Sequence, residues 1–180
     1  MYILKKDLLL SLMDYCSDGG RVHFHRDGIA PYLAEGGSVG IYLHEEYVCR
    51  VASAADYFRA SMDMLNPEVM AQLFPANRPV QTKERADVST YYAEEAVVKN
   101  CLIADGCYIE GELQDCIVFP HVRVEKGAKL ENCVIMQDTV IRRDAALKCV
   151  VADKACEISQ GCFLAGAPRL PILVPKGTSI

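Results

Sequence analysis

A short apolar phrase that begins with cysteine recurs four times in the second half of the chain, at spacings of 15, 17 and 16 residues. Shorter units of about six residues, each carrying an aliphatic residue, fill the space between these phrases. A fixed period in this range indicates a solenoid, in which each coil buries its apolar row against the next. The phrases are Cys101-Leu102-Ile103, Cys116-Ile117-Val118, Cys133-Val134-Ile135 and Cys149-Val150-Val151.

The elements of this repeat are predicted to be strands. They are short, rich in β-branched residues and separated by corners such as Asp105-Gly106 and Lys126-Gly127. The 3.6-residue apolar period of a helix is absent. We therefore expect a mainly β fold, namely a left-handed parallel β-helix of hexapeptide repeats over residues 97–180, with an α/β fragment before it. Such a repeat specifies architecture and not function.

Nine cysteines admit three interpretations: a disulfide framework, a zinc site, or small buried hydrophobic side chains. No C-x-x-C pair exists, and seven of the nine lie within the repeat. The cysteines that open the four phrases are expected to stack in one column. We interpret them as buried, reduced hydrophobic residues.

Charge and hydropathy exclude two classes of partner. The net charge is −5, and the acidic and basic residues are interspersed, whereas a nucleic-acid surface would be a basic stripe. No apolar run approaches the length of about eighteen residues that a membrane span needs, and no signal-peptide pattern is present. The sequence thus predicts a cytoplasmic chain without nucleic-acid or membrane partners.

The first half of the chain is predicted to hold a few short elements and a linker. We expect strands at residues 1–4 and Gly40–Leu43, a helix over Lys6–Tyr15, and a helix that starts at Ser53. Asp56 stands three positions after Ser53, which is a capping-box spacing. Residues 1–73 would form one fragment and residues 74–96, which contain Pro75 and Pro79, a linker. Because two strands leave sheet edges exposed, this fragment is expected to belong to a larger domain or to need a partner.

Histidines offer weak metal and catalytic candidates. His23 and His25 would lie on one face of a strand and could bind a metal, but no third ligand is nearby, so a solvated loop is favoured. His121 is the single histidine in the repeat, and a trimeric hexapeptide acyltransferase would use it as a general base. A carbonic anhydrase of the hexapeptide type needs three zinc-binding histidines, which excludes that class. We predict no cofactor or metal for this chain.

Distinctive strings occur in both halves of the chain, among them NCLIADGC at residues 100–107 and NCVIMQDT at residues 132–139. They resemble the strings NSLIADGC and NSVIMQDT of ADP-glucose pyrophosphorylase, also called glucose-1-phosphate adenylyltransferase, of bacterial glycogen synthesis. Residues 57–65 resemble YYxANMDLL, and Ala152-Asp153-Lys154 resembles a terminal DK segment. The resemblance implies that residues 1–73 are the C-terminal fragment of a nucleotidyltransferase-like α/β domain.

Departures from the family pattern imply a subunit without catalysis. The Gly-rich phosphate loop has no counterpart in this chain. Glu46–Ser53 aligns with the family's GYWxDVGT, in which the aspartate helps to hold the metal on the phosphates; Tyr47 and Ser53 keep a tyrosine and a hydroxyl, while the aspartate is replaced by Arg50. A guanidinium repels Mg²⁺, on which phosphoryl transfer depends. The metal would therefore serve only a catalytic partner.

The resemblance implies a regulatory-type subunit that assembles with a catalytic subunit, with itself, or with both. The alternatives are the acyltransferase and a purely structural assembly module. Effectors of this family are phosphorylated metabolites, phosphate or nucleotides, which need cations. Lys154 follows the terminal aspartate of a segment that some members use for activators, and Arg142 and Arg143 add charge at a corner of the coil. We predict these three residues as effector contacts, with solvated turn charges as the alternative.

Overall fold

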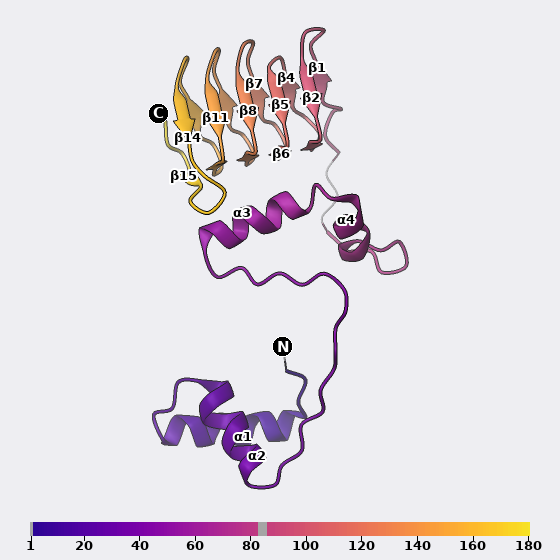
Figure 1. The fold of residues 1–180 in the computed structure, drawn as a ribbon, viewed down its shortest axis with the longest axis vertical. Helices are drawn as coiled ribbons and strands as arrows, with labels where there is room; N and C mark the ends of the chain where they lie inside the picture. Colours follow the sequence, from indigo (N-terminus) through magenta and orange to yellow (C-terminus); the bar gives the residue numbers. More distant parts are fainter. Residues whose placement is uncertain (1, 83–85) are drawn as a thin grey trace. The chain divides into compact units, whose positions relative to one another are not determined.

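The computed structural model describes residues 2–82 and 86–180, which form two compact units. One unit ends at Glu45, and the other is Glu46–Ile180. Figure 1 shows the second unit as a stack of strands with helices before it in the chain. No helix within the described ranges is both long and apolar enough to cross a membrane.

The solenoid consists of three parallel sheets of five strands each, so each coil adds one strand to every sheet. Sheet A holds β1 (Tyr91–Tyr92), β4 (Tyr108–Ile109), β7 (Arg123–Val124), β10 (Val140–Ile141) and β13 (Glu157–Ile158). Sheet B holds β2 (Val97–Lys99), β5 (Glu112–Gln114), β8 (Lys129–Glu131), β11 (Ala146–Lys148) and β14 (Phe163–Ala165). Sheet C holds β3 (Leu102–Ile103), β6 (Ile117–Val118), β9 (Val134–Ile135), β12 (Val150–Ala152) and β15 (Ile172–Val174). The predicted hexapeptide-repeat β-helix is confirmed.

Aliphatic side chains fill the axis of the solenoid in rows set by the strand register. Leu113, Leu130 and Leu147 form one such row in sheet B and are almost completely buried. Ile109, Val124, Ile141 and Ile158 form the corresponding row in sheet A. Side chains alternate across each strand, so one residue in two points inward and the others face outward.

The cysteine column contains three of the four predicted members. The register pairs Val134 with Val151, so the neighbour of Cys133 in the next coil is Val150 and not Cys149. Cys149 instead takes the place of Asn132 in the preceding turn, and both have a positive φ, of 49° and 52°. The spacing of 16 residues therefore places Cys149 one residue early, and the prediction of a four-membered column was wrong. The column consists of Cys101, Cys116 and Cys133.

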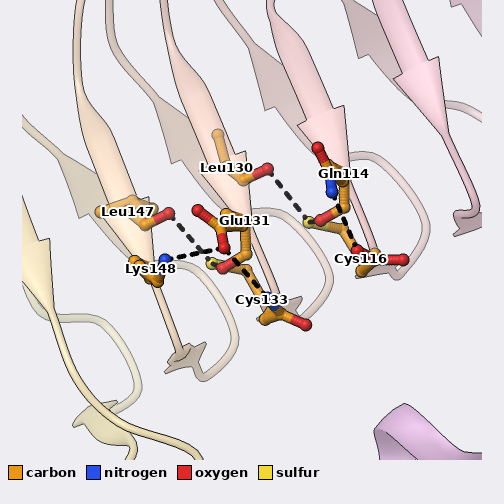
Figure 2. A network of polar contacts seen from close by, with 9 residues as sticks. Gln114, Cys116, Leu130, Glu131, Cys133, Leu147 and Lys148 are labelled. Atoms are coloured by element: carbon orange, nitrogen blue, oxygen red, sulfur yellow. Dashed lines mark hydrogen bonds and ion pairs between the residues drawn. The ribbon is translucent and has the colours of Figure 1, made fainter.

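The column cysteines are free thiols hydrogen-bonded to backbone carbonyls, and Figure 2 shows two of them, Cys116 and Cys133. The Cys116 thiol lies 3.1 Å from the Gln114 carbonyl oxygen and 3.5 Å from that of Leu130 in the next coil. Cys133 repeats the pattern one coil on, with Glu131 at 3.3 Å and Leu147 at 3.5 Å. A hydrogen bond with Cys116 and burial raise the pKa of the Cys101 thiol, which opposes thiolate chemistry there. The interpretation as small buried residues agrees with this environment.

Paired strands begin before the expected boundary near residue 96. β1 lies inside the stretch 74–96, and it pairs with β4. Thr90 extends the contact, because its hydroxyl donates to the Ala104 carbonyl at 2.7 Å. The end of that stretch is therefore part of the first coil, and the predicted linker also includes residues 83–85, which lie outside the described residues.

Two helices precede the solenoid within the second unit: α3 (Ala54–Asp63) and α4 (Pro67–Leu73). Asn66 caps α4 by accepting a hydrogen bond from the Glu68 amide, so Pro67 begins a helix. Phe58 of α3 is only 2% exposed and packs on Val134, Cys149 and Val151 of the outer face of sheet C. The outward position of Cys149 thus serves the contact between α3 and the solenoid.

The first unit contains three short helices. They are α1 (Lys6–Asp18), the π-helix η1 (Phe24–Ile29) and α2 (Ala30–Ala34). The predicted helix is three residues longer than expected at its C-terminal end, and its Leu12 and Cys16 are buried together with Ile29. Gly28 allows the close approach, since a Cβ there would lie 3.1 Å from the Cys16 sulfur.

The two predicted strands of this part do not form. Residues 2–4 and Gly40–Leu43 are extended without strand pairing, and Ile41 is 95% exposed. A strand needs a neighbour for its backbone groups, and no described segment of the chain pairs with either stretch. The two expected strands were therefore wrong, and the described part of residues 1–73 is helical and irregular.

Candidate functional site

The segment Glu46–Ser53 is irregular but is tied to both helices by Tyr47. The Tyr47 hydroxyl donates a hydrogen bond to Asp63 at the end of α3, at 2.8 Å. Its backbone amide donates to the Gln72 side chain of α4 at 2.6 Å. Burial, together with the bond to Asp63, raises the pKa of Tyr47, so the phenol stays protonated and acts as a donor. Tyr47 therefore positions this segment.

Ser53 has a structural task at the start of α3. Its hydroxyl accepts a hydrogen bond from the Asp56 amide at 3.1 Å and donates to the Asp56 carboxylate at 2.8 Å. The same carboxylate accepts from the Ala52 amide at 3.3 Å, so the predicted capping box is present. The hydrogen bond from Ser53 is the main cause that lowers the pKa of Asp56. The carboxylate is thus committed to the cap.

Arg50 gives the segment a positive charge at the centre. Its side chain is exposed, and no ion pair of Arg50 occurs within residues 2–82 and 86–180. A guanidinium binds phosphate or carboxylate and cannot ligate a cation. No cluster of three or more metal-binding side chains occurs in the described part of the chain either. The weak candidate metal pair lies at η1: His23 directly precedes this helix and His25 is within it. The His23 amide donates a hydrogen bond to the Asp27 carboxylate at 3.1 Å.

The three cations predicted as effector contacts differ in their surroundings. Arg142 forms ion pairs with Glu125 at 3.0 Å and with Glu157 at 2.7 Å, so its charge is already compensated. The hydrogen bond with Glu157, followed by that with Glu125, raises the pKa of Arg142 further. Arg143 uses its backbone amide to bond Glu125 at 3.2 Å, and its side chain is exposed.

Lys154 lies at a different corner of the solenoid from the two arginines. Lys154 is in the turn before β13, and its amide bonds the Asp153 carboxylate at 2.7 Å. Arg142 directly follows β10, so the two residues are at opposite ends of sheet A. The structure does not gather Lys154 and Arg142 into one cluster.

His121 occupies a turn of the solenoid between two carboxylates. Its φ is 61°, its Nε2 lies 3.2 Å from the Asp87 carboxylate, and its Nδ1 lies 3.4 Å from that of Asp138. A general base needs one ring nitrogen directed at the substrate. Both nitrogens of His121 face carboxylates of this chain instead, which gives the acyltransferase hypothesis no support.

Comparisons with known proteins show which sequences this chain is similar to. The family model described as GlmU-like, C-terminal hexapeptide matches residues 86–167. The chain is 38% identical over 136 residues to the glycogen biosynthesis protein GlgD of Bacillus subtilis, covering 76% of this chain and 40% of that protein. It is 26% identical over 132 residues to a glucose-1-phosphate adenylyltransferase of Acetivibrio thermocellus, covering 73% of this chain and 31% of the relative.

The chain is therefore similar both to GlgD and to glucose-1-phosphate adenylyltransferases. A Bacillus mycoides glucose-1-phosphate adenylyltransferase is also similar, with 27% identity over 141 residues, 78% of this chain and 38% of the relative. The chain spans about 40% or less of the length of these relatives. It corresponds to a C-terminal portion that includes the hexapeptide repeat, as the resemblance in residues 100–107 and 132–139 implies.

Two features of the site escaped the sequence analysis. The pairing of Arg142 with Glu125 and Glu157 joins residues 15 to 17 positions apart, which is one coil of the repeat. The repeat period could have indicated it, because opposite charges one period apart face each other on neighbouring strands. The bond between Tyr47 and Asp63 joins an irregular segment to a helix end, and no periodic signal marks it.

Proposed function

We propose that this chain is part of a non-catalytic, regulatory-type subunit that assembles with a catalytic glucose-1-phosphate adenylyltransferase subunit in glycogen biosynthesis. The observation that carries the proposal is the higher identity to GlgD, 38%, compared with 26% and 27% to the adenylyltransferases. The exposed Arg50 supports it, because it stands where catalytic members of the family have a metal-binding aspartate.

The regulatory role is tested by adding this chain to a catalytic subunit from the same organism and measuring ADP-glucose formation with Mg²⁺. We expect co-purification and a change in rate or in effector response, because a non-catalytic subunit acts through differential binding to the states of its partner. Co-purification with unchanged rates and effector curves would favour the structural assembly module. Failure to co-purify would contradict the proposal.

Replacement of Lys154 or Arg143 by alanine is expected to raise the effector concentration that gives half of the response by about tenfold. Loss of one charge-assisted hydrogen bond to a phosphate has about this effect. The measurement is the effector titration of the assembled complex. Because Arg142 is neutralised by two glutamates, Arg142→Ala is expected to leave that concentration nearly unchanged and serves as the matched control. Equal effects of all three substitutions would contradict this division.

A further inference from the structure

The outer face of sheet B differs from the outer faces of the other two sheets. The outer face of sheet C packs on α3 through Phe58. On sheet A, Arg142 pairs with its glutamate neighbours on both sides. Sheet B instead has an open hollow of 310 Å³ that follows the stack of strands, lined by residues of all five of its strands. Among the described residues of the second unit, those that line this hollow all belong to sheet B.

Two rows of side chains form the walls of the hollow. The register of the sheet defines a first row of Val97, Glu112, Lys129, Ala146 and Phe163. It defines a second row of Lys99, Gln114, Glu131, Lys148 and Ala165. The leucines between the rows point inward, so the floor of the hollow is low. The first row has exposed apolar residues at both ends, since Phe163 is 74% and Val97 42% exposed.

Charges on this face alternate and nearly cancel. Glu112 pairs with Lys129 at 3.1 Å within the first row, and Glu131 pairs with Lys148 at 2.8 Å within the second. Lys99 is the one remaining charge in the two rows. A face with three cations and two anions carries little net charge, although the whole chain has a net charge of −5. Two such faces therefore meet with little repulsion.

We propose that the outer face of sheet B binds the same face of a second copy of this chain, about a two-fold axis parallel to the stack of coils. Such an axis brings each coil opposite its own counterpart and places the first row of one copy over the second row of the other. Lys129 of each copy then faces Glu131 of the other, at the central coil. An isologous contact repeats every such pair twice.

The remaining facings of this arrangement are also compatible. Glu112 faces Gln114 and Phe163 faces Ala165, while Val97 and Ala146 face the aliphatic stems of Lys99 and Lys148, so no two like charges meet. A two-fold axis along the strands would instead place Lys129 over Lys129 and Glu131 over Glu131. Like charges in contact across an interface cost affinity. The charge pattern thus selects the axis parallel to the stack.

The size of the face sets the expected affinity. Five strands about 4.8 Å apart and three residues long give a face of roughly 24 by 10 Å. Two such faces bury only about 500 Å² in total, less than a standard protein interface, so binding is weak and reversible. We therefore expect a dimer with a dissociation constant on the order of 100 µM. The inference concerns this chain alone and does not depend on the proposed function.

The test is a charge exchange between copies, followed by sedimentation velocity over a range of concentrations. Lys129→Glu alone places two glutamates opposite each other at each central pair, and Glu131→Lys alone places two lysines there. Each variant is expected to raise the dissociation constant about tenfold or more. An equal mixture of the two variants should dimerise again, since each glutamate then faces a lysine of the other variant.

The control is Arg169→Glu, which makes the same change in charge as Lys129→Glu in an exposed turn outside sheet B. It should dimerise as the unchanged chain does. An unchanged chain that stays monomeric at about 100 µM would overturn the proposal. So would single variants that associate as well as the unchanged chain, because association would then use another surface. Circular dichroism of each variant verifies the fold before sedimentation.

Discussion

Substitution of Leu130 by alanine is expected to lower the free energy of unfolding of the solenoid by about 3 kcal/mol, the middle of the range for buried leucines. Leu130 is 2% exposed and lies between Leu113 and Leu147 in the axial row. Its removal leaves a cavity that rigid neighbours on both sides cannot fill. In a solenoid each coil contacts only its neighbours, so a defect in the central coil weakens both halves.

Urea unfolding followed by circular dichroism measures this loss. Leu170→Ala is the matched control, because it removes the same atoms from a side chain that is 78% exposed in a turn. Its expected effect is below about 0.5 kcal/mol, as for other surface substitutions. Similar losses from both substitutions would contradict the axial packing described above.

The solenoid was predictable from the repeat, because the period indicates both the spacing of the strands and the residues whose side chains point to the axis. The exact register was not predictable from the cysteines alone. Cys149 looked equivalent to Cys133 because both precede two aliphatic residues, but backbone pairing places Val150 beside Cys133. The residue before each column position lies in a left-handed turn, which Asn or Asp adopts readily and cysteine rarely. Cys149 occupies this turn position, although its residue type suggested the column.

Prediction was weakest where an element depends on atoms outside its own segment. Gly40–Leu43 has the composition of a strand, but strand formation needs a paired neighbour that no described segment supplies. The cap at Ser53 was predictable because both of its partners lie within three residues. Lys154 and Arg142 were grouped by charge, whereas the coil geometry separates them and gives Arg142 two carboxylate partners.

Two successive contacts connect the solenoid to the segment Glu46–Ser53 of the candidate site. Phe58 fixes α3 on sheet C, and Tyr47 fixes the segment on the end of α3 through Asp63. These contacts hold Tyr47, three residues before Arg50, against the end of α3.

Phe58→Ala is expected to release α3 from the solenoid, with a local loss of about 3 kcal/mol, the lower end of the range for buried aromatic residues. A helix of ten residues is marginal by itself in water, so α3 owes its stability to packing. Amide hydrogen exchange should therefore accelerate by about a hundredfold in α3, the kinetic equivalent of roughly 3 kcal/mol. Segment Glu46–Ser53 should become more accessible with it, because Tyr47 loses its fixed partner.

The solenoid itself should keep its slow exchange in the Phe58 variant, because its axial rows do not contain Phe58. Phe74→Ala is the matched control: it removes the same ring from a position that is 46% exposed just after α4. We expect that variant to leave exchange in α3 unchanged. Unaltered exchange in α3 after Phe58→Ala would show that the helix is held by other contacts, whereas faster exchange throughout the strands would show that α3 stabilises the whole solenoid. Selective release of α3 would show that Phe58 holds this helix on the solenoid.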